Sequence, residues 1–173
     1  ATALLLCVLT MTVQTAWALS GNWSDYKATA FSTINESAKT ISITSEEELA
    51  LLAYNTCNGI DYTGYTITLT KDLYMSDHYW DKSIGNSYDN CFRGTFDGAN
   101  KTISGINISS GAYKGLFGYV GQSEKPGTIQ NVTLASSTII GKAYVGGIVG
   151  YLQYGTVSKR HVLCSVYSLA SGD

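Results

Sequence analysis

The sequence is poor in proline, cysteine, histidine and charge, and the low charge and the few histidines leave two classes of function without support. It holds one proline, four cysteines and two histidines in 173 residues, and 14% of its residues are charged. The formal net charge is −2, and nothing in the sequence suggests the basic stripe that nucleic-acid binding requires. A His-Glu-x-x-His segment is absent, so zinc protease activity has no support. We expect no cofactor and no metal site.

The residues that are abundant favour a β-rich, exported protein. Eighteen glycines and thirteen tyrosines are typical of short strands joined by turns. The length suits one domain. Residues 1–18 are nearly all apolar and end with small residues at Ala16 and Ala18, which predicts a secretory signal peptide, here without its start. This stretch is too short and weakly flanked to be a membrane anchor. We therefore expect a secreted or cell-surface protein.

The cysteines of the mature chain, Cys57, Cys91 and Cys164, are odd in number, so at most one pair can form within it. Their spacing fits no zinc site, and His78 and His161 do not add ligands at suitable spacing. Buried or incidental thiols are one interpretation, and a Cys57–Cys91 disulfide is the other.

Two segments near the end of the chain repeat one pattern. Tyr113-Lys-Gly-Leu-Phe-Gly-Tyr119 matches Tyr144-Val-Gly-Gly-Ile-Val-Gly-Tyr151, and each is followed by a Gly-Thr-Ile/Val segment at Gly127 or Gly155. A period of about thirty residues indicates stacked repeats. The glycines assigned to this repeat are Gly115, Gly118, Gly127, Gly146, Gly147, Gly150 and Gly155. They lead into strands, so they predict tight coil turns and not a phosphate-binding loop.

The remaining pattern predicts one helix followed by short strands. Ser45 and Glu48 form a capping-box pattern at the start of a helix of about three turns that ends near Gly59. Residues 65–70 alternate as a half-buried strand, and short strands continue without helices after residue 92. Among a sandwich, a barrel and a solenoid, the repeat favours a parallel β-helix, with the helix covering one end of the stack. Residues 19–40 are expected to be a polar leader.

The segments just quoted resemble the GLUG motif, a short repeat of exported and surface proteins of bacteria. Residues 43–53, 67–73, and 94–106 resemble the cap, strand and coil that precede such repeats. The resemblance implies a right-handed parallel β-helix over residues 41–173, adhesin-like, with no catalytic residues to transfer. Asn131 should join a buried asparagine ladder. Its counterpart Lys159, with Arg160, should loosen or end the last coil. The chain is expected to be a fragment that lacks later coils and domains.

Two groups of residues compete for a functional role. Asp72, Asp77, Asp81, Asp89 and Asp97, with Arg93 nearby, could serve a polysaccharide-active β-helix enzyme, but solvated loop and turn carboxylates are the better explanation. Tyr79, Trp80, Tyr88 and Tyr113 are candidate glycan contacts, or they cover sheet edges. The favoured interpretation is a non-enzymatic structural or adhesive module of an exported bacterial surface protein, with a host glycan or surface protein as partner. A lyase- or hydrolase-like enzyme is the alternative.

Overall fold

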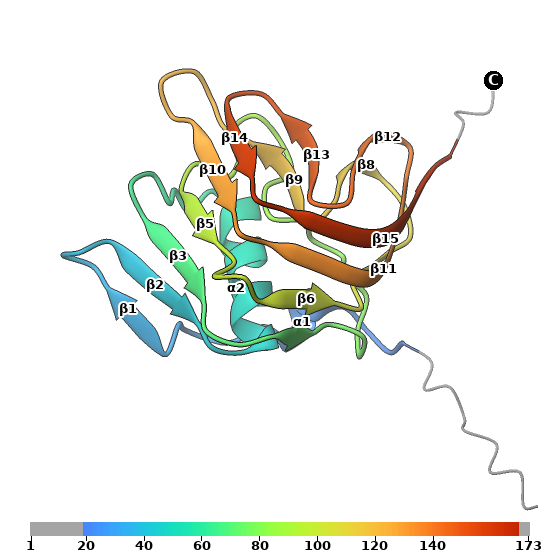
Figure 1. Ribbon diagram of the computed structural model, residues 1–173, viewed down its shortest axis with the longest axis horizontal. Helices are drawn as coiled ribbons and strands as arrows, with labels where there is room; N and C mark the ends of the chain where they lie inside the picture. The colour runs from blue at the N-terminus through green and yellow to red at the C-terminus, as the bar shows by residue number, and fades with distance from the viewer. Residues whose placement is uncertain (1–18, 170–173) are drawn as a thin grey trace, which may run out of the picture.

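The structure is a computed structural model that describes residues 19–169, arranged as a β-solenoid of about four turns. The expected signal peptide, residues 1–18, lies outside the described residues. No helix within residues 19–169 is long and apolar enough to cross a membrane. The predicted parallel β-helix is confirmed (Figure 1).

The elements follow one another as successive coils. Coil 1 contains β2 (Thr40–Ile43) and α2 (Glu46–Cys57), and it is preceded by α1 (Trp23–Tyr26) and β1 (Thr33–Asn35). Coil 2 contains β3 (Thr66–Leu69) and β4 (Leu73–Tyr74). Coil 3 contains β5 (Thr95–Asp97), β6 (Thr102–Ser104), β7 (Asn107–Ile108), β8 (Ala112–Lys114) and β9 (Phe117–Val120). Coil 4 contains β10 (Gly127–Gln130), β11 (Thr133–Gly141), β12 (Ala143–Val145) and β13 (Val149–Leu152). Coil 5 is described over β14 (Gly155–Ser158) and β15 (His161–Ser168).

Strands of equivalent position stack in register from coil to coil. The largest sheet has six strands in the order β1-β2-β3-β5-β10-β14, and all its pairs are parallel except β1 with β2. A second sheet runs β15-β11-β6-β4, with β7 beside β11. The pairs β8–β12 and β9–β13 complete the wall. The Gly127–Gly155 pairing places the two copies of the sequence repeat directly over each other.

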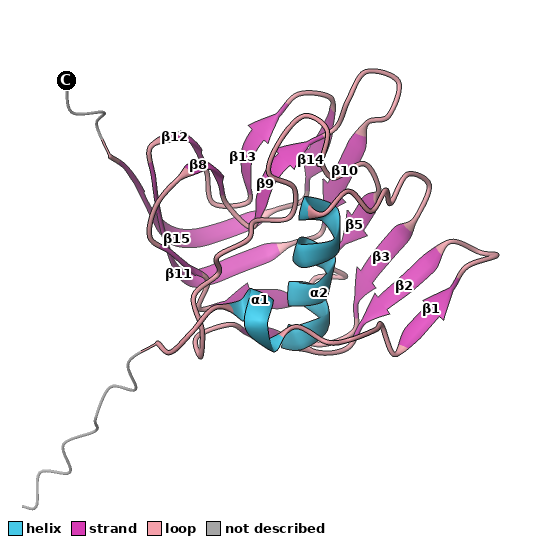
Figure 2. Cartoon of the chain, turned by 180° about the vertical axis from the view of Figure 1, so that it is seen from behind, coloured by secondary structure: helices cyan, strands magenta, loops and turns pink. Residues whose placement is uncertain are grey.

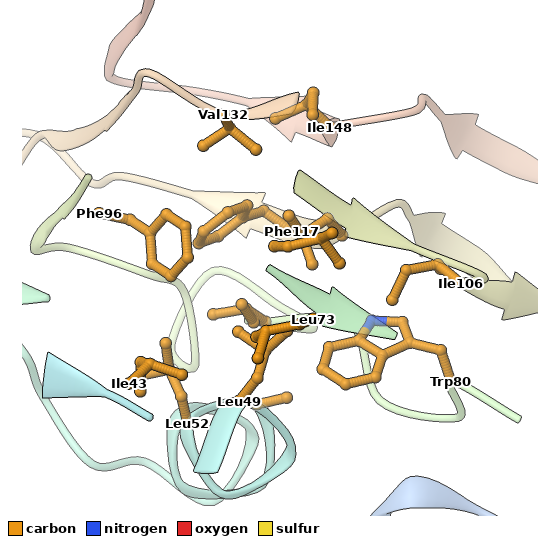
Figure 3. Packing of buried hydrophobic residues seen from close by; sticks show 14 of the residues in the cluster. Ile43, Leu49, Leu52, Leu73, Trp80, Phe96, Ile106, Phe117, Val132 and Ile148 are labelled. Carbon is orange, nitrogen blue, oxygen red and sulfur yellow. The ribbon is translucent and has the colours of Figure 1, made fainter. Parts of the chain in front are cut away.

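The core lies inside the coils because alternate residues of each strand point inward. One inward column is formed by Ile41, Ile67, Phe96, Ile129 and Val157. The first four of these side chains are fully buried, and each contributes about 1.5–3 kcal/mol of transfer free energy. Phe117 and Trp80 fill the space between the walls (Figure 3). On the outer face, threonines occupy the same position on five successive strands, at Thr40, Thr66, Thr95, Thr128 and Thr156.

Helix α2 covers the N-terminal end of the stack, as expected for a terminal coil that needs a cover (Figure 3). Its buried residues Leu49 and Leu52 face Ile43 and Leu73 (Figure 3). Figure 2 shows α2 in front of the sheets when the molecule is seen from behind. Ser45 Oγ accepts a hydrogen bond from the Glu48 N–H at 3.3 Å. The Glu48 carboxylate does not return to the Ser45 N–H as a capping box requires. It accepts instead from the N–H groups of Thr44 and Ser32, each at 2.6 Å.

Residues 19–40, expected to be a polar leader to the fold, pack against the solenoid. Trp23 of α1 is buried in the common core, and its indole N–H donates to the Met75 carbonyl at 3.0 Å. β1 adds an antiparallel strand to the edge of β2. The sequence does not predict this packing, because Trp23 is a single buried aromatic residue among polar ones and forms no periodic apolar pattern.

The last coil does not end at Lys159 and Arg160. β15 continues for eight residues in parallel register with β11. Lys159 has a φ of 46° and Asn131 a φ of 55°, so both occupy the same left-handed turn. Both cations are exposed, and the expected desolvation cost therefore does not arise. Asn131 donates to Asp97 Oδ1 at 2.9 Å, so its described partner is a carboxylate and not a ladder of asparagines.

Candidate functional site

The four residues predicted to contact glycans have different environments, and one of them, Tyr113, stacks on Tyr144. Trp80 is 1% exposed and belongs to the core, so its ring cannot form a binding platform. Tyr88 is exposed and packs edge-on against Tyr119 at 6.4 Å. Tyr79 is 39% exposed and lines a cavity of about 290 Å³. The buried Trp80 cannot belong to the expected platform, and of the four residues Tyr79 has its side chain exposed at a cavity wall.

The cavity lies where three chain segments run side by side. Residue 79 pairs with residue 22 through an isolated parallel bridge, and Trp23 N–H donates to the Tyr79 carbonyl at 2.9 Å. On the other side, Trp80 N–H donates to the Asn107 carbonyl at 2.9 Å. The turn after β7 and the end of β8 complete the lining. Backbone hydrogen bonds thus hold the cavity walls independently of any ligand.

Most side chains that line the cavity are polar. Its polar lining residues are Asn22, Tyr79, Asp81, Asn107, Ser109, Ser110 and Lys114. Asp81 Oδ1 accepts from the Ser24 N–H at 3.1 Å. Lys114 Nζ has a long contact of 3.4 Å with the Asp81 carbonyl oxygen, and burial lowers the pKa of its ammonium group. The arrangement offers hydrogen-bond donors and acceptors, together with one charge of each sign.

A cluster of tyrosines arises directly from the repeat, and sequence reasoning missed it. Tyr113 and Tyr144 are stacked with ring centroids 4.8 Å apart and planes within 2°. Tyr119 and Tyr151, paired on β9 and β13, have centroids 4.8 Å apart. The sequence feature that could have predicted this cluster is the tyrosine at both ends of each repeated segment. Because Tyr119 is buried and the rings cover one another, we assign this cluster to coil stacking.

The repeat glycines have no room for a side chain. A Cβ atom at any of the seven would come within 2.8 Å of another atom. At Gly118 it would lie 2.2 Å from the Gly85 carbonyl oxygen, and at Gly155 1.9 Å from that of Gly127. Gly155 also has a φ of 141°, which L-residues rarely adopt. These contacts with neighbouring coils support a packing role.

The acidic residues do not assemble around Arg93. Arg93 Nε lies 3.2 Å from Asp61 Oδ1, although it lacks hydrogen-bond alignment, and Arg93 Nη1 donates to Gln122. Burial would raise the pKa of Asp61, but hydrogen bonds from Thr63 and the Arg93 charge hold it below its usual value. Within residues 19–169, no three His, Cys, Asp or Glu side chains group as a metal site would need.

The thiols of Cys57, Cys91 and Cys164 are all free, so the structure has no Cys57–Cys91 disulfide. Burial raises the pKa of the Cys57 and Cys91 thiols. Raised pKa values make thiols poor nucleophiles at neutral pH, and the interpretation as buried thiols fits both residues.

Comparison with known proteins gives a similarity over part of the chain. No protein-family model and no solved structure matches the chain. A stretch of 94 residues is 36% identical to Halomucin from Haloquadratum walsbyi (strain DSM 16790 / HBSQ001), covering 50% of this chain. The chain spans about 1% of the length of that curated relative.

Proposed function

We propose that this chain is a non-enzymatic structural and adhesive β-helix module of an exported cell-surface protein, related to GLUG-repeat proteins. The main support for this proposal is the amino-acid composition of coil 5. Val162 and Val166 pair with Leu134 and Ile139, which are fully buried in coil 4. The two valines are 42% and 43% exposed. Core-type residues on an uncovered coil suit a stack that continues in the same polypeptide.

Two further observations support a module within a longer protein. β14 and β15 are the last strands of their sheets in the described part of the chain, and their outer edges are unpaired there. Halomucin is far longer than this chain, since the match covers only 1% of its length. The apolar residues 1–18, which precede the described part, support export to the surface.

A tandem duplication of coil 4 tests the modular role. Repeating residues 127–154 once keeps the spacing between Gly127 and Gly155, so the added coil can stack in register. We expect one cooperative unfolding transition, a larger urea m-value and a midpoint no lower than that of the original chain. The matched control carries serine at the inserted copies of Ile129, Leu134 and Ile139, and it should lose this coupling. A separate transition for the intact duplication would contradict the proposal.

A polysaccharide assay tests the non-enzymatic part. The chain is incubated with uronate polymers and neutral polysaccharides, and reducing ends and unsaturated products are measured over time. We expect no sustained product release, because Arg93 pairs with Asp61 outside the acidic series of residues 72–97. Turnover that disappears in an Asp97→Asn or Asp81→Asn variant would establish the alternative enzyme.

A further inference from the structure

We propose that the cavity beside Tyr79 binds a single saccharide residue of a glycan. This inference rests on the adhesive half of the proposed function and assigns it a site. The volume of about 290 Å³ is at the lower end of ligand pockets, which suits one sugar ring better than a larger ligand. The cavity is the recess between residues 22, 79–81, 107–110 and 114.

The lining offers the mixture of groups that a sugar requires. Each sugar hydroxyl donates and accepts, so a complementary wall needs both functions within reach. The amides of Asn22 and Asn107 supply donors and acceptors, and the hydroxyls of Ser109 and Ser110 can serve as either. None of these four side chains makes a hydrogen bond within residues 19–169. Their hydrogen-bonding capacity is directed to solvent or to a ligand.

The two charged groups favour a hydroxylated ligand over a phosphate. Lys114 and Asp81 both line the cavity, yet they form no ion pair within the described residues. The ammonium group can donate to a sugar oxygen while the carboxylate accepts from a neighbouring hydroxyl. A phosphate would bring about two negative charges against Asp81 with one lysine to compensate them. The hydrogen bonds that Lys114 and Asp81 would make to sugar hydroxyls are charge-assisted, and such bonds are stronger than those between neutral groups.

One wall is aromatic and the frame is rigid. Tyr79 is 39% exposed, so its ring offers an apolar surface with a polar end. The backbone on either side of it is held by hydrogen bonds to Trp23 and Asn107. Adjacent strands therefore fix the spacing of the polar groups before any ligand binds, which lowers the entropy lost on binding.

Chemical-shift mapping on the whole 173-residue chain tests the site. The ¹⁵N-labelled protein is titrated with the methyl glycosides of hexoses, N-acetylhexosamines and hexuronic acids, one at a time. We expect at least one series to shift the amides of residues 22, 79–81, 107–110 and 114, with saturation in the millimolar range. No saturable shift with any of them, or shifts confined to the Tyr144–Tyr151 surface, would overturn the proposal. Inorganic phosphate or sulfate giving the same shifts while the sugars give none would also overturn it.

Substitutions separate binding from folding. Asn107→Ala and Lys114→Met each remove a donor to the ligand and should weaken binding about tenfold or more. Ser110 is exposed, so Ser110→Ala should weaken ligand binding without altering the midpoint of thermal unfolding. Lys142→Met, an exposed lysine outside the cavity, is the matched control and should leave both unchanged. Equal affinity in all four variants would overturn the site. The coil-duplication experiment is independent of this result, so a failed pocket leaves the structural module standing.

Discussion

At the scale of single residues, Glu48 joins three parts of the N-terminal end. Only 3% of this residue is exposed. Its carboxylate accepts from the Ser32 N–H, from the Thr44 N–H and from the Thr44 hydroxyl at 2.9 Å. The residue before β1, the residue after β2 and the start of α2 are thereby connected through one side chain. The sequence pattern identified Glu48 but not Ser32, because a contact across sixteen residues leaves no local trace.

Glu48→Ala should therefore destabilise the fold more than most single substitutions at the start of a helix. Two backbone N–H groups would lose their acceptor in a part-buried place, and we expect a loss of about 2–3 kcal/mol in the free energy of unfolding. Urea denaturation measures it. Glu47→Ala is the matched control, because Glu47 is adjacent, acidic and exposed, and it should change the free energy by about 0.5 kcal/mol or less. Equal effects of both variants would show that the loss reflects helix charge alone.

The same residue gives the protein an acid-sensitive component of stability. Burial would raise the pKa of Glu48, but the hydrogen bonds from Ser32 and Thr44 outweigh it and the pKa lies below its usual value. A lowered folded-state pKa means that stability is fully present above the unfolded value of about 4.3 and is lost as the pH falls through the folded value. Glu48→Gln should unfold with a shallower pH dependence in this acidic range.

Urea titrations at a series of pH values measure the effect. The slope should decrease without disappearing, because Glu46, Asp61 and Asp97 also have lowered pKa values. An unchanged slope in Glu48→Gln would mean that this carboxyl titrates alike in the folded and unfolded chains.

At the scale of elements, the tyrosine cluster couples β8 and β9 of coil 3 to β12 and β13 of coil 4. Tyr144 stacks flat on Tyr113 and meets Tyr151 edge-on with centroids 5.0 Å apart. Aromatic pairs of this geometry contribute about 0.5–1.5 kcal/mol each beyond their buried area. Tyr144→Ala should lower the free energy of unfolding by about 1–2 kcal/mol and reduce the near-ultraviolet circular dichroism.

The comparison variant is Tyr74→Ala on β4. Tyr74 is 65% exposed and has no aromatic neighbour among the described residues, so its removal should have little effect on either signal. If Tyr144→Ala is equally mild, the rings are merely adjacent and coil stacking depends on the glycines and core alone.

At the scale of the whole molecule, the sequence predicts stacking much better than lateral packing. The repeat glycines and the alternating strands recur from coil to coil, so the pairing of Gly127 with Gly155 follows from the repeat itself. The cavity joins Asn22, Asp81 and Asn107 from parts of the chain that share no repeat. Residues 75–92 form an irregular segment of coil 2, and their polarity hid the burial of Trp80. Local patterns carry no record of such contacts.

The exposed apolar side chains of coil 5 lead to a prediction about the isolated chain. Val162 and Val166 occupy inward positions that the preceding coil fills with buried side chains, but they remain over 40% exposed. Uncovered apolar surface beside unpaired strand edges promotes association between molecules. We therefore expect the isolated chain to self-associate reversibly as its concentration rises. The Val162→Ser/Val166→Ser variant should remain monomeric, with a loss of only about 1 kcal/mol in stability because both side chains are already partly hydrated.

Sedimentation velocity at several concentrations distinguishes the outcomes. The matched control is Ile34→Ser on β1, the N-terminal edge strand of the six-stranded sheet, where it removes a side chain of 42% exposure. Because β1 is short and pairs antiparallel to its neighbour, its edge does not present the register of the next coil, and this variant should associate like the original chain. Association that persists in the valine variant and disappears in Ile34→Ser would assign the self-association surface to the N-terminal edge. The proposed continuation of the stack at coil 5 would then lose its physical basis.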